Sequence, residues 1–287
     1  MFEKIKNFSF KTWLIVAITS VFLIVGGFLG YTYLSGKWSK GSSPEFSLVD
    51  KHKDKDDGQS KETKDIEKRK EEDKGYLKEK LDGLSSTNKD SVGFIYIPGT
   101  KLEEPVVQGT DNETYLNKTF EGGNVPFLGA VYLDANNSRY FTDRLTWMFG
   151  HARGSKVGDH RMFNDVNYYA SQSFMDGHRY VVVETPHRKL YYEVAFMTIV
   201  PEETALYRLD FLDDEDYFEH LEKVRGQATT VNGNVSLRAG DKYLVLSTCR
   251  EEDDTLRANL YCRLIPDSEL GAVLDAQGSN LDYKKTR

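Results

Sequence analysis

Two cysteines, Cys249 and Cys262, are the only thiols in this 287-residue chain. Cys249 ends the strand-like run LSTC and precedes polar residues, which places its thiol at the rim of a β structure, where substrates bind. A thiolate at such a position can attack an acyl group once a base or a cation activates it. Cys262 lies inside the apolar run ANLYCRLI and is expected to pack as a small hydrophobe. A disulfide between the two would silence the nucleophile, although neighbouring strand positions rarely meet the geometry of the bridge.

His151 is the histidine best placed to exchange a proton with that thiol. It ends the apolar run LTWMFGH, so a rigid strand would hold an exposed imidazole there. A strand-capping or surface role is the alternative for this residue. The other histidines are expected in a charged spacer, beside polar turns or in solvated charged segments: His52, His160, His178, His187 and His220.

Arg257 is the third candidate for the chemistry. Acyl transfer builds negative charge on the attacked carbonyl oxygen, and a fixed cation can stabilise that charge. Arg257 opens the run RANLYCRLI after a short acidic loop, so two strands joined by this loop would set it near Cys249. Arg250 should point away from the nucleophile, because successive side chains of a strand alternate. Arg263 lies deeper in the run and is expected to pair with an acid.

The elements that would position these residues are mostly strands. Aromatic residues make up 13% of the chain, and runs rich in Val, Ile, Tyr and Phe are bounded by Gly, Pro, Asn or Asp. Apolar periodicity predicts helices over residues 161–171 and 214–224 and near 65–84. Many short strands with few helices predict a mainly β, α+β fold with a closed or sandwich-like sheet. The predicted strands cover residues 92–99, 129–134, 145–151, 179–185, 189–200, 241–249 and 258–265.

The N-terminal part reads as a membrane anchor. Residues 12–34 carry no charge and are long enough to cross a bilayer as a helix. Lysines in residues 1–11 predict that this tail stays in the cytoplasm. We expect an uncleaved signal anchor, with a cleaved signal peptide as the alternative, because the apolar run is long. The chain would then be a single-pass protein of the cell membrane, with its catalytic domain outside the cell.

A charged spacer at residues 35–75 and a catalytic domain at residues 76–287 are expected to follow. Asp54, Asp56 and Asp57 in the spacer do not have the spacing of a calcium loop, so no metal and no cofactor are expected. The net charge of −7 argues against a nucleic-acid partner.

The order of these features resembles a class B sortase. A membrane anchor is followed by a strand ending in Gly-His, a strand ending in LSTC, and an arginine that opens the last strand. The supporting stretches are residues 92–117, 149–169 and 246–265, and the resemblance spans residues 76–266. It implies an eight-stranded β-barrel with an N-terminal helix, and a further helix in the long loop before the nucleophile strand.

The resemblance also implies roles for individual residues. Cys249 would be the nucleophile, His151 its acid–base partner, and Arg257 the residue that binds the oxyanion or orients the substrate. Substrate contacts would come from Ser247 and from a hydrophobic wall formed by Leu206 and Tyr207. Two departures bear on substrate preference: Ala-Arg follows His151 where class B members commonly carry Asn-Met, and the loop between Cys249 and Arg257 is slightly shorter than is typical.

The implied activity is cleavage of a sorting signal through a cysteine thioester, followed by transfer of the acyl group to an amine. The partners would be surface proteins or pilins that carry the signal, with a cell-wall peptide or a lysine as the amine. Cell-wall anchoring and pilus polymerisation both fit this chemistry. The remaining alternatives are a thiol protease that uses water as acceptor and a non-catalytic, membrane-tethered binding module.

Overall fold

The computed structural model of the protein describes residues 58–125, 128–152, 161–204 and 206–286. The predicted tail (1–11), membrane span (12–34) and calcium-loop candidates (54–57) lie outside these residues. In the described part of the chain, every helix is too short or too polar to cross a bilayer.

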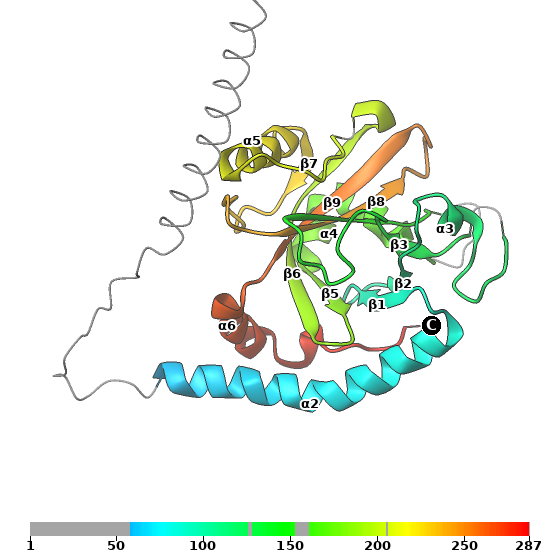
Figure 1. The fold of residues 1–287 in the computed structure, drawn as a ribbon. Coiled ribbons are helices and arrows are strands. Elements are labelled where there is room, and N and C mark those ends of the chain that lie inside the picture. Colours follow the sequence, from blue (N-terminus) through cyan, green and yellow to red (C-terminus); the bar gives the residue numbers. More distant parts are fainter. Residues whose placement is uncertain (1–57, 126–127, 153–160, 205, 287) are drawn as a thin grey trace, which may run out of the picture. The chain divides into compact units, whose positions relative to one another are not determined.

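Nine strands form one sheet, and eight of them close into a barrel (Figure 1). The closed order is β5-β1-β2-β3-β4-β8-β9-β6, and β6 returns to β5. β7 pairs with the second half of β6 and lies outside the ring. The predicted eight-stranded barrel is therefore confirmed. The strands are β1 (Ser91–Tyr96), β2 (Glu103–Val107), β3 (Val131–Leu133), β4 (Leu145–Phe149), β5 (Tyr180–Glu184), β6 (Lys189–Pro201), β7 (Ala228–Val231), β8 (Tyr243–Cys249) and β9 (Leu256–Leu264).

Helices lie on the outside of the barrel and within the connections between strands (Figure 1). The α-helices are α2 (Gly58–Thr87), α3 (Thr114–Asn117), α4 (Gln172–Gly177), α5 (Asp214–Arg225) and α6 (Asp267–Gln277). Short 3₁₀ helices are η2 (Asn164–Ala170), η3 (Glu202–Thr204) and η4 (Gly278–Leu281). The helix predicted near residues 65–84 is part of the longer α2, and the helix predicted over 214–224 is α5.

The single helix predicted over residues 161–171 is wrong. Residues of that segment form the 3₁₀ helix η2, and α4 follows after Ser171. Asn164, Asp165 and Asn167 are all buried in η2, and the last two bind distant groups, since Asp165 accepts from the Lys101 N–H and Asn167 donates to the Cys249 carbonyl. These tertiary contacts override the regular helix that the apolar spacing predicted. The apolar spacing still identified the buried face of this segment, since Phe163, Val166 and Tyr169 are buried in the core.

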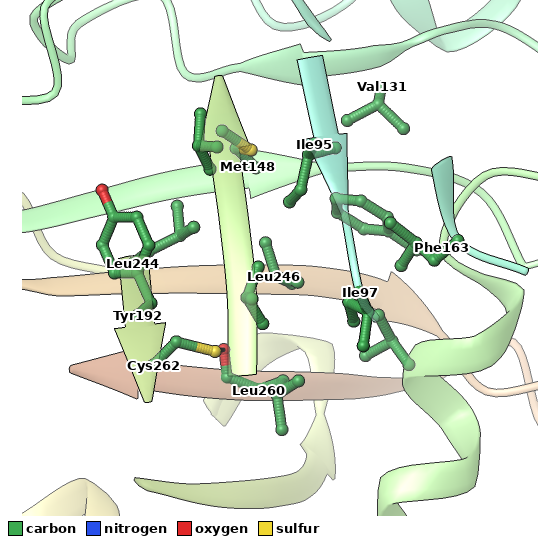
Figure 2. Packing of buried hydrophobic residues seen from close by; sticks show 14 of the residues in the cluster. Ile95, Ile97, Val131, Met148, Phe163, Tyr192, Leu244, Leu246, Leu260 and Cys262 are labelled. Atoms are coloured by element: carbon green, nitrogen blue, oxygen red, sulfur yellow. Dashed lines mark hydrogen bonds between the residues drawn. The ribbon is translucent and has the colours of Figure 1, made fainter. Parts of the chain in front are cut away.

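The interior of the barrel is an apolar core (Figure 2). Leu244 and Leu246 of β8 point into it, and Cys262 packs among the same side chains with no solvent exposure. Burial raises the pKa of the Cys262 thiol far above its usual value, so this cysteine is an inert core residue. Both cysteines are free thiols, which rules out the competing disulfide.

α2 is held to the barrel through a partly buried lysine. Lys80 Nζ lies 2.6 Å from Glu184 Oε2, and the Glu184 side chain has no solvent exposure. The same ammonium group sits over the rings of Phe94 and Tyr283, at 3.5 and 3.9 Å from their centroids. This contact joins α2, two barrel strands and the C-terminal segment at one point, and aromatic faces favour a cation there.

α5 covers the outer face of β8 and β9 through a second apolar cluster. Tyr217, Leu221 and Val224 are buried against it, as the periodicity predicted. The helix begins at Asp213, whose side chain accepts a hydrogen bond from the Asp216 N–H at 2.9 Å.

His220 of α5 was expected in solvent, and that expectation is wrong. The residue is buried, its ring lies 5.3 Å from the ring of Phe211, and Nε2 has no hydrogen-bond partner. Burial, and then the positive charge of Arg208, lower the pKa of His220 from 6.5 to about 4.

This shift predicts a pH-dependent stability. The unfolded chain binds a proton at His220 more tightly than the folded chain, so the contribution is complete above pH 6.5 and is lost as the pH falls toward 4. We expect His220→Gln, which cannot titrate, to reduce the loss of unfolding free energy over this interval in urea denaturation. The exposed His187 provides the control, since His187→Gln should leave the pH dependence unchanged. An unaltered slope in the His220 variant would contradict the assignment.

Candidate active site

Strand pairing brings the three predicted catalytic residues to the same end of the barrel. In the antiparallel pair of β8 and β9, Cys249 lies directly opposite Arg257. In the parallel pair of β4 and β8, Phe149 is level with Ser247, and the Gly150 N–H donates to the Ser247 carbonyl at 3.2 Å. His151 follows Phe149 by two residues, as Cys249 follows Ser247. The register therefore places His151 and Arg257 on the two strands that flank the thiol.

These residues line a cavity of about 530 Å³ on the outer face of the barrel. Cys249, His151, Arg257, Ser247 and Tyr207 all contribute to its wall. The sixth predicted residue, Leu206, is not in the wall and packs instead against the apolar cluster under α5. Because side chains alternate along β8, Ser247 and Cys249 face this cavity while Leu246 faces the core.

The hydrogen bond of His151 fixes the role of each ring nitrogen. Nε2 lies 2.7 Å from the Leu116 carbonyl oxygen. A carbonyl oxygen only accepts, so Nε2 carries a proton in this arrangement. Nδ1 is then the nitrogen at which His151 can exchange a proton with a neighbouring group.

Arg257 is held by groups on both sides of its strand. Its Nη2 lies 2.6 Å from Glu202 Oε2, and its Nη1 donates to the Asp254 carbonyl at 2.7 Å. Glu202 belongs to η3, whose backbone meets the β8–β9 loop where the Glu202 N–H donates to the Thr255 carbonyl at 3.1 Å. The Glu202 side chain is 66% exposed, so the pair orients the guanidinium and adds little stability.

The backbone of the predicted nucleophile is fixed from the other side by Asn167 of η2. Its Nδ2 donates to the Cys249 carbonyl at 3.1 Å, and its Oδ1 accepts from Arg250 Nη1 at 3.0 Å. Arg250 also pairs with Glu252 and is absent from the cavity wall, as predicted from strand alternation. Arg263 pairs with Asp241 and Glu269, also as predicted.

Other residues complete the cavity wall: Asn112, Leu116, Tyr132, Trp147, Phe149, Gly150, Glu202 and Thr248. Tyr132 lines the same cavity. Burial raises the pKa of its phenol, Asp134 and an ionised Cys249 act in the same direction, and Arg257 opposes them. Trp147 joins two further aromatic side chains of the wall, with its ring centroid 5.2 Å from that of Tyr207 and 6.1 Å from that of Phe149.

Sequence reasoning did not find these additional wall residues. Asn112 and Leu116 lie within the stretch that carries the resemblance, but their residue types carry no chemical signal. Glu202 comes directly after a predicted strand and is one acid among many. Its place beside Arg257 depends on a long-range contact that no local pattern reveals.

A larger cavity, of about 770 Å³, lies between the β1–β2 turn, α4 and the C-terminal segment. Its wall includes His178 but no cysteine, so thiol chemistry is confined to the smaller cavity. Among the described residues, no three His, Cys, Asp or Glu side chains form a cluster that could bind a metal.

Comparisons with known proteins place this geometry in a family. No family model matches the chain. Sortase B of Staphylococcus aureus (strain NCTC 8325 / PS 47) is 30% identical over 172 residues, which cover 60% of this chain and 68% of that protein. Sortase B of Listeria monocytogenes (serovar 1/2a) is 29% identical over 177 residues, covering 61% and 69%.

Solved structures agree with these relatives. A Staphylococcus aureus sortase B–substrate complex superposes with a TM-score of 0.61 at 27% identity, covering 72% of this chain and 94% of that one. The 2.0 Å structure of Staphylococcus aureus sortase B gives a TM-score of 0.60 at 28% identity, covering 71% and 98%. The chain belongs to the sortase B family and is a cysteine transpeptidase.

Proposed function

We propose that Cys249 is the nucleophile of this transpeptidase, with His151 as its acid–base partner and Arg257 as the stabiliser of the oxyanion. The observation that carries the proposal is the cross-strand pair of Cys249 and Arg257, with His151 just beyond the end of the neighbouring strand β4 and all three side chains in one cavity. A thiol, an imidazole and a fixed guanidinium are the groups that acyl transfer needs.

In the first half-reaction, the Cys249 thiolate attacks the scissile carbonyl carbon of a sorting signal. A carbon–sulfur bond forms, and the carbonyl oxygen takes up negative charge beside the Arg257 guanidinium. The carbon–nitrogen bond then breaks as the His151 imidazolium gives a proton from Nδ1 to the leaving amine. The product is a thioester on Cys249.

In the second half-reaction, an amine attacks the thioester carbonyl. Its proton passes to His151, the carbon–sulfur bond breaks, and the thiolate is regenerated with a new amide bond in the product. The kinetic pattern is ping-pong. Structures of sortase B with a substrate and with a triglycine peptide support a peptide donor and an amine acceptor for this chain.

We assign substrate contacts to Ser247 and Tyr207, which line the cavity together with the apolar rings of Trp147 and Phe149. Leu206 supports this wall from behind, because it packs on the apolar cluster rather than facing the cavity. The Tyr207 hydroxyl donates to Asp134 Oδ2 at 2.6 Å, which holds the ring at the cavity edge.

The proposed cellular role is the anchoring of surface proteins to the cell wall. The uncharged residues 12–34 would hold the enzyme in the membrane by one span, with residues 1–11 in the cytoplasm and the barrel outside the cell. The acceptor would be an amine of a cell-wall peptide. A pilin lysine as acceptor would make the same enzyme a pilus polymerase.

The experiment that tests the proposal is mass spectrometry of the full-length chain in detergent, incubated with sorting-signal peptides and candidate amines. We expect an acyl adduct on Cys249 that one class of amine resolves into a new amide. Release of free acid at the same rate with and without amines would instead indicate a thiol protease. An unmodified Cys249 with every peptide would contradict the proposal.

Substitutions at the site should separate the roles. Cys249→Ala should abolish turnover and leave the circular dichroism spectrum and melting temperature close to those of the wild type. Arg257→Lys should lower kcat by about 100-fold, because an ammonium point charge cannot reproduce the paired donors of the planar guanidinium beside the oxyanion. Rates are measured by peptide cleavage in the presence of the amine that resolves the thioester fastest. Residual turnover in the Cys249 variant would show that another group is the nucleophile.

Asn167 should act as a positioning residue. Asn167→Ala removes the hydrogen bond to the Cys249 carbonyl and frees Arg250, so we expect kcat to fall by about tenfold with little change in KM. The neighbouring Tyr168→Ala is the control, because Tyr168 is 43% exposed and absent from the catalytic cavity. Equal kcat values in the two variants would show that Asn167 does not position the nucleophile.

A further inference from the structure

Three rows of side chains cross the outer face of β8, β9 and β6. The first, which we call the catalytic row, is Cys249, Arg257 and Val200. Two residues along each strand lies the polar row, which is Ser247, Asn259 and Thr198. The aromatic row follows, with Val245, Tyr261 and Phe196. Directly paired residues point to the same face, so each row lies side by side across the sheet.

The centre of the polar row holds an amide without partners. Asn259 has no solvent exposure, and neither its Nδ2 nor its Oδ1 makes a hydrogen bond. A buried carboxamide normally finds partners for both its donors and its acceptor, since leaving them unpaired destabilises the fold. Val or Ile would suit this strand position better if packing were its only task. Such a group directly beside a residue of the catalytic cavity indicates a ligand that completes it.

The polar row reaches the catalytic cavity through Ser247, which lies beside Asn259 and lines the cavity wall. Successive rows are about 7 Å apart along the strands. That distance equals about two residues of an extended peptide. An acyl donor bound at Cys249 can therefore bring an amide group over Asn259.

The segment that follows β6 packs partly on this face, through Leu206, Leu209 and Phe211. None of the described residues 202–204 and 206–212 is buried. Leu206, which packs on the cluster that contains Tyr261 and Phe196, has a φ of +53°, in the left-handed region that a branched side chain avoids. Trp147 Nε1 donates to the Arg208 carbonyl at 3.2 Å, and the Tyr207 hydroxyl donates to Asp134, so this segment is held in place. A donor peptide can reach the polar row from the catalytic cavity, past Ser247.

We propose that Asn259 is a specificity-determining residue that hydrogen-bonds an amide group of the donor peptide, either a backbone peptide or an Asn or Gln side chain, within about two residues of the scissile bond. A carboxamide presents a donor and an acceptor together, which matches another amide in a paired arrangement. This inference rests on the proposed function of Cys249 as the acyl carrier.

The test compares stability with catalysis in Asn259→Leu, which keeps the branching of the side chain and replaces the unpaired atoms by methyl groups. We expect the melting temperature of the full-length protein to rise by about 2–4 °C, because the unsatisfied amide is gone. With the sorting-signal peptide that wild type cleaves fastest, kcat/KM should fall at least about tenfold. Asn259→Val, which is smaller and suits a strand, gives the same readout if Leu disturbs the fold.

Tyr261→Phe is the matched control. Its hydroxyl lies on the same face in the aromatic row, is equally buried and also lacks a partner. Removing it should leave kcat/KM unchanged. The inference is overturned if the Asn259 variants fold and cleave the peptide at the wild-type rate, while the proposed function then still stands. Wild-type protein that cleaves no peptide would overturn both.

Discussion

The active site depends on the register of two strands. β8 and β9 pair so that Cys249 lies opposite Arg257, and the same pairing turns Leu246 and Leu260 into the core. A slip of one residue would move the thiol to the core side and the leucines to the cavity side. Burial of the leucines, which fixes the register of the barrel, therefore also fixes the catalytic geometry. No separate interaction is needed to hold Cys249 and Arg257 side by side.

Closure of the barrel gives this register its rigidity. β6 pairs with β9 along one edge and with β5 and β7 along the other, so the catalytic strands have no free edge on that side. The opposite flank is β4, which carries His151 beyond its end in the parallel register with β8. Two short 3₁₀ helices add further contacts to the site: η2 holds the Cys249 carbonyl through Asn167, and η3 orients Arg257 through Glu202. The enzyme thus combines a rigid nucleophile strand with side-chain contacts from neighbouring helices.

Local sequence patterns predicted the residues at strand ends well and the contacts between distant segments poorly. The end of β8 at Cys249 follows from an apolar run that stops at polar residues, whereas β4 ends at Phe149, two residues before the predicted end at His151. β2 was not predicted, because Glu103, Glu104 and Pro105 interrupt the apolar pattern expected of a strand, although both acids are buried. His220 was misplaced because its burial comes from Phe211 and the loop before α5. Asn259 gives no local signal either. One polar residue in an apolar strand indicates a function only when its cross-strand neighbours, Ser247 and Thr198, are known.

The most direct test of this account is a crystal structure of the protein after reaction with a donor peptide that carries an aldehyde in place of the scissile amide. The thiol adds to the aldehyde, and the resulting oxygen occupies the place of the oxyanion. The account predicts that this oxygen lies within about 3 Å of the Arg257 guanidinium, with the His151 imidazole on the other side of the Cys249 sulfur. An oxygen that points away from Arg257, or an adduct that leaves the Arg257–Glu202 pair facing solvent with no contact to the peptide, would contradict it.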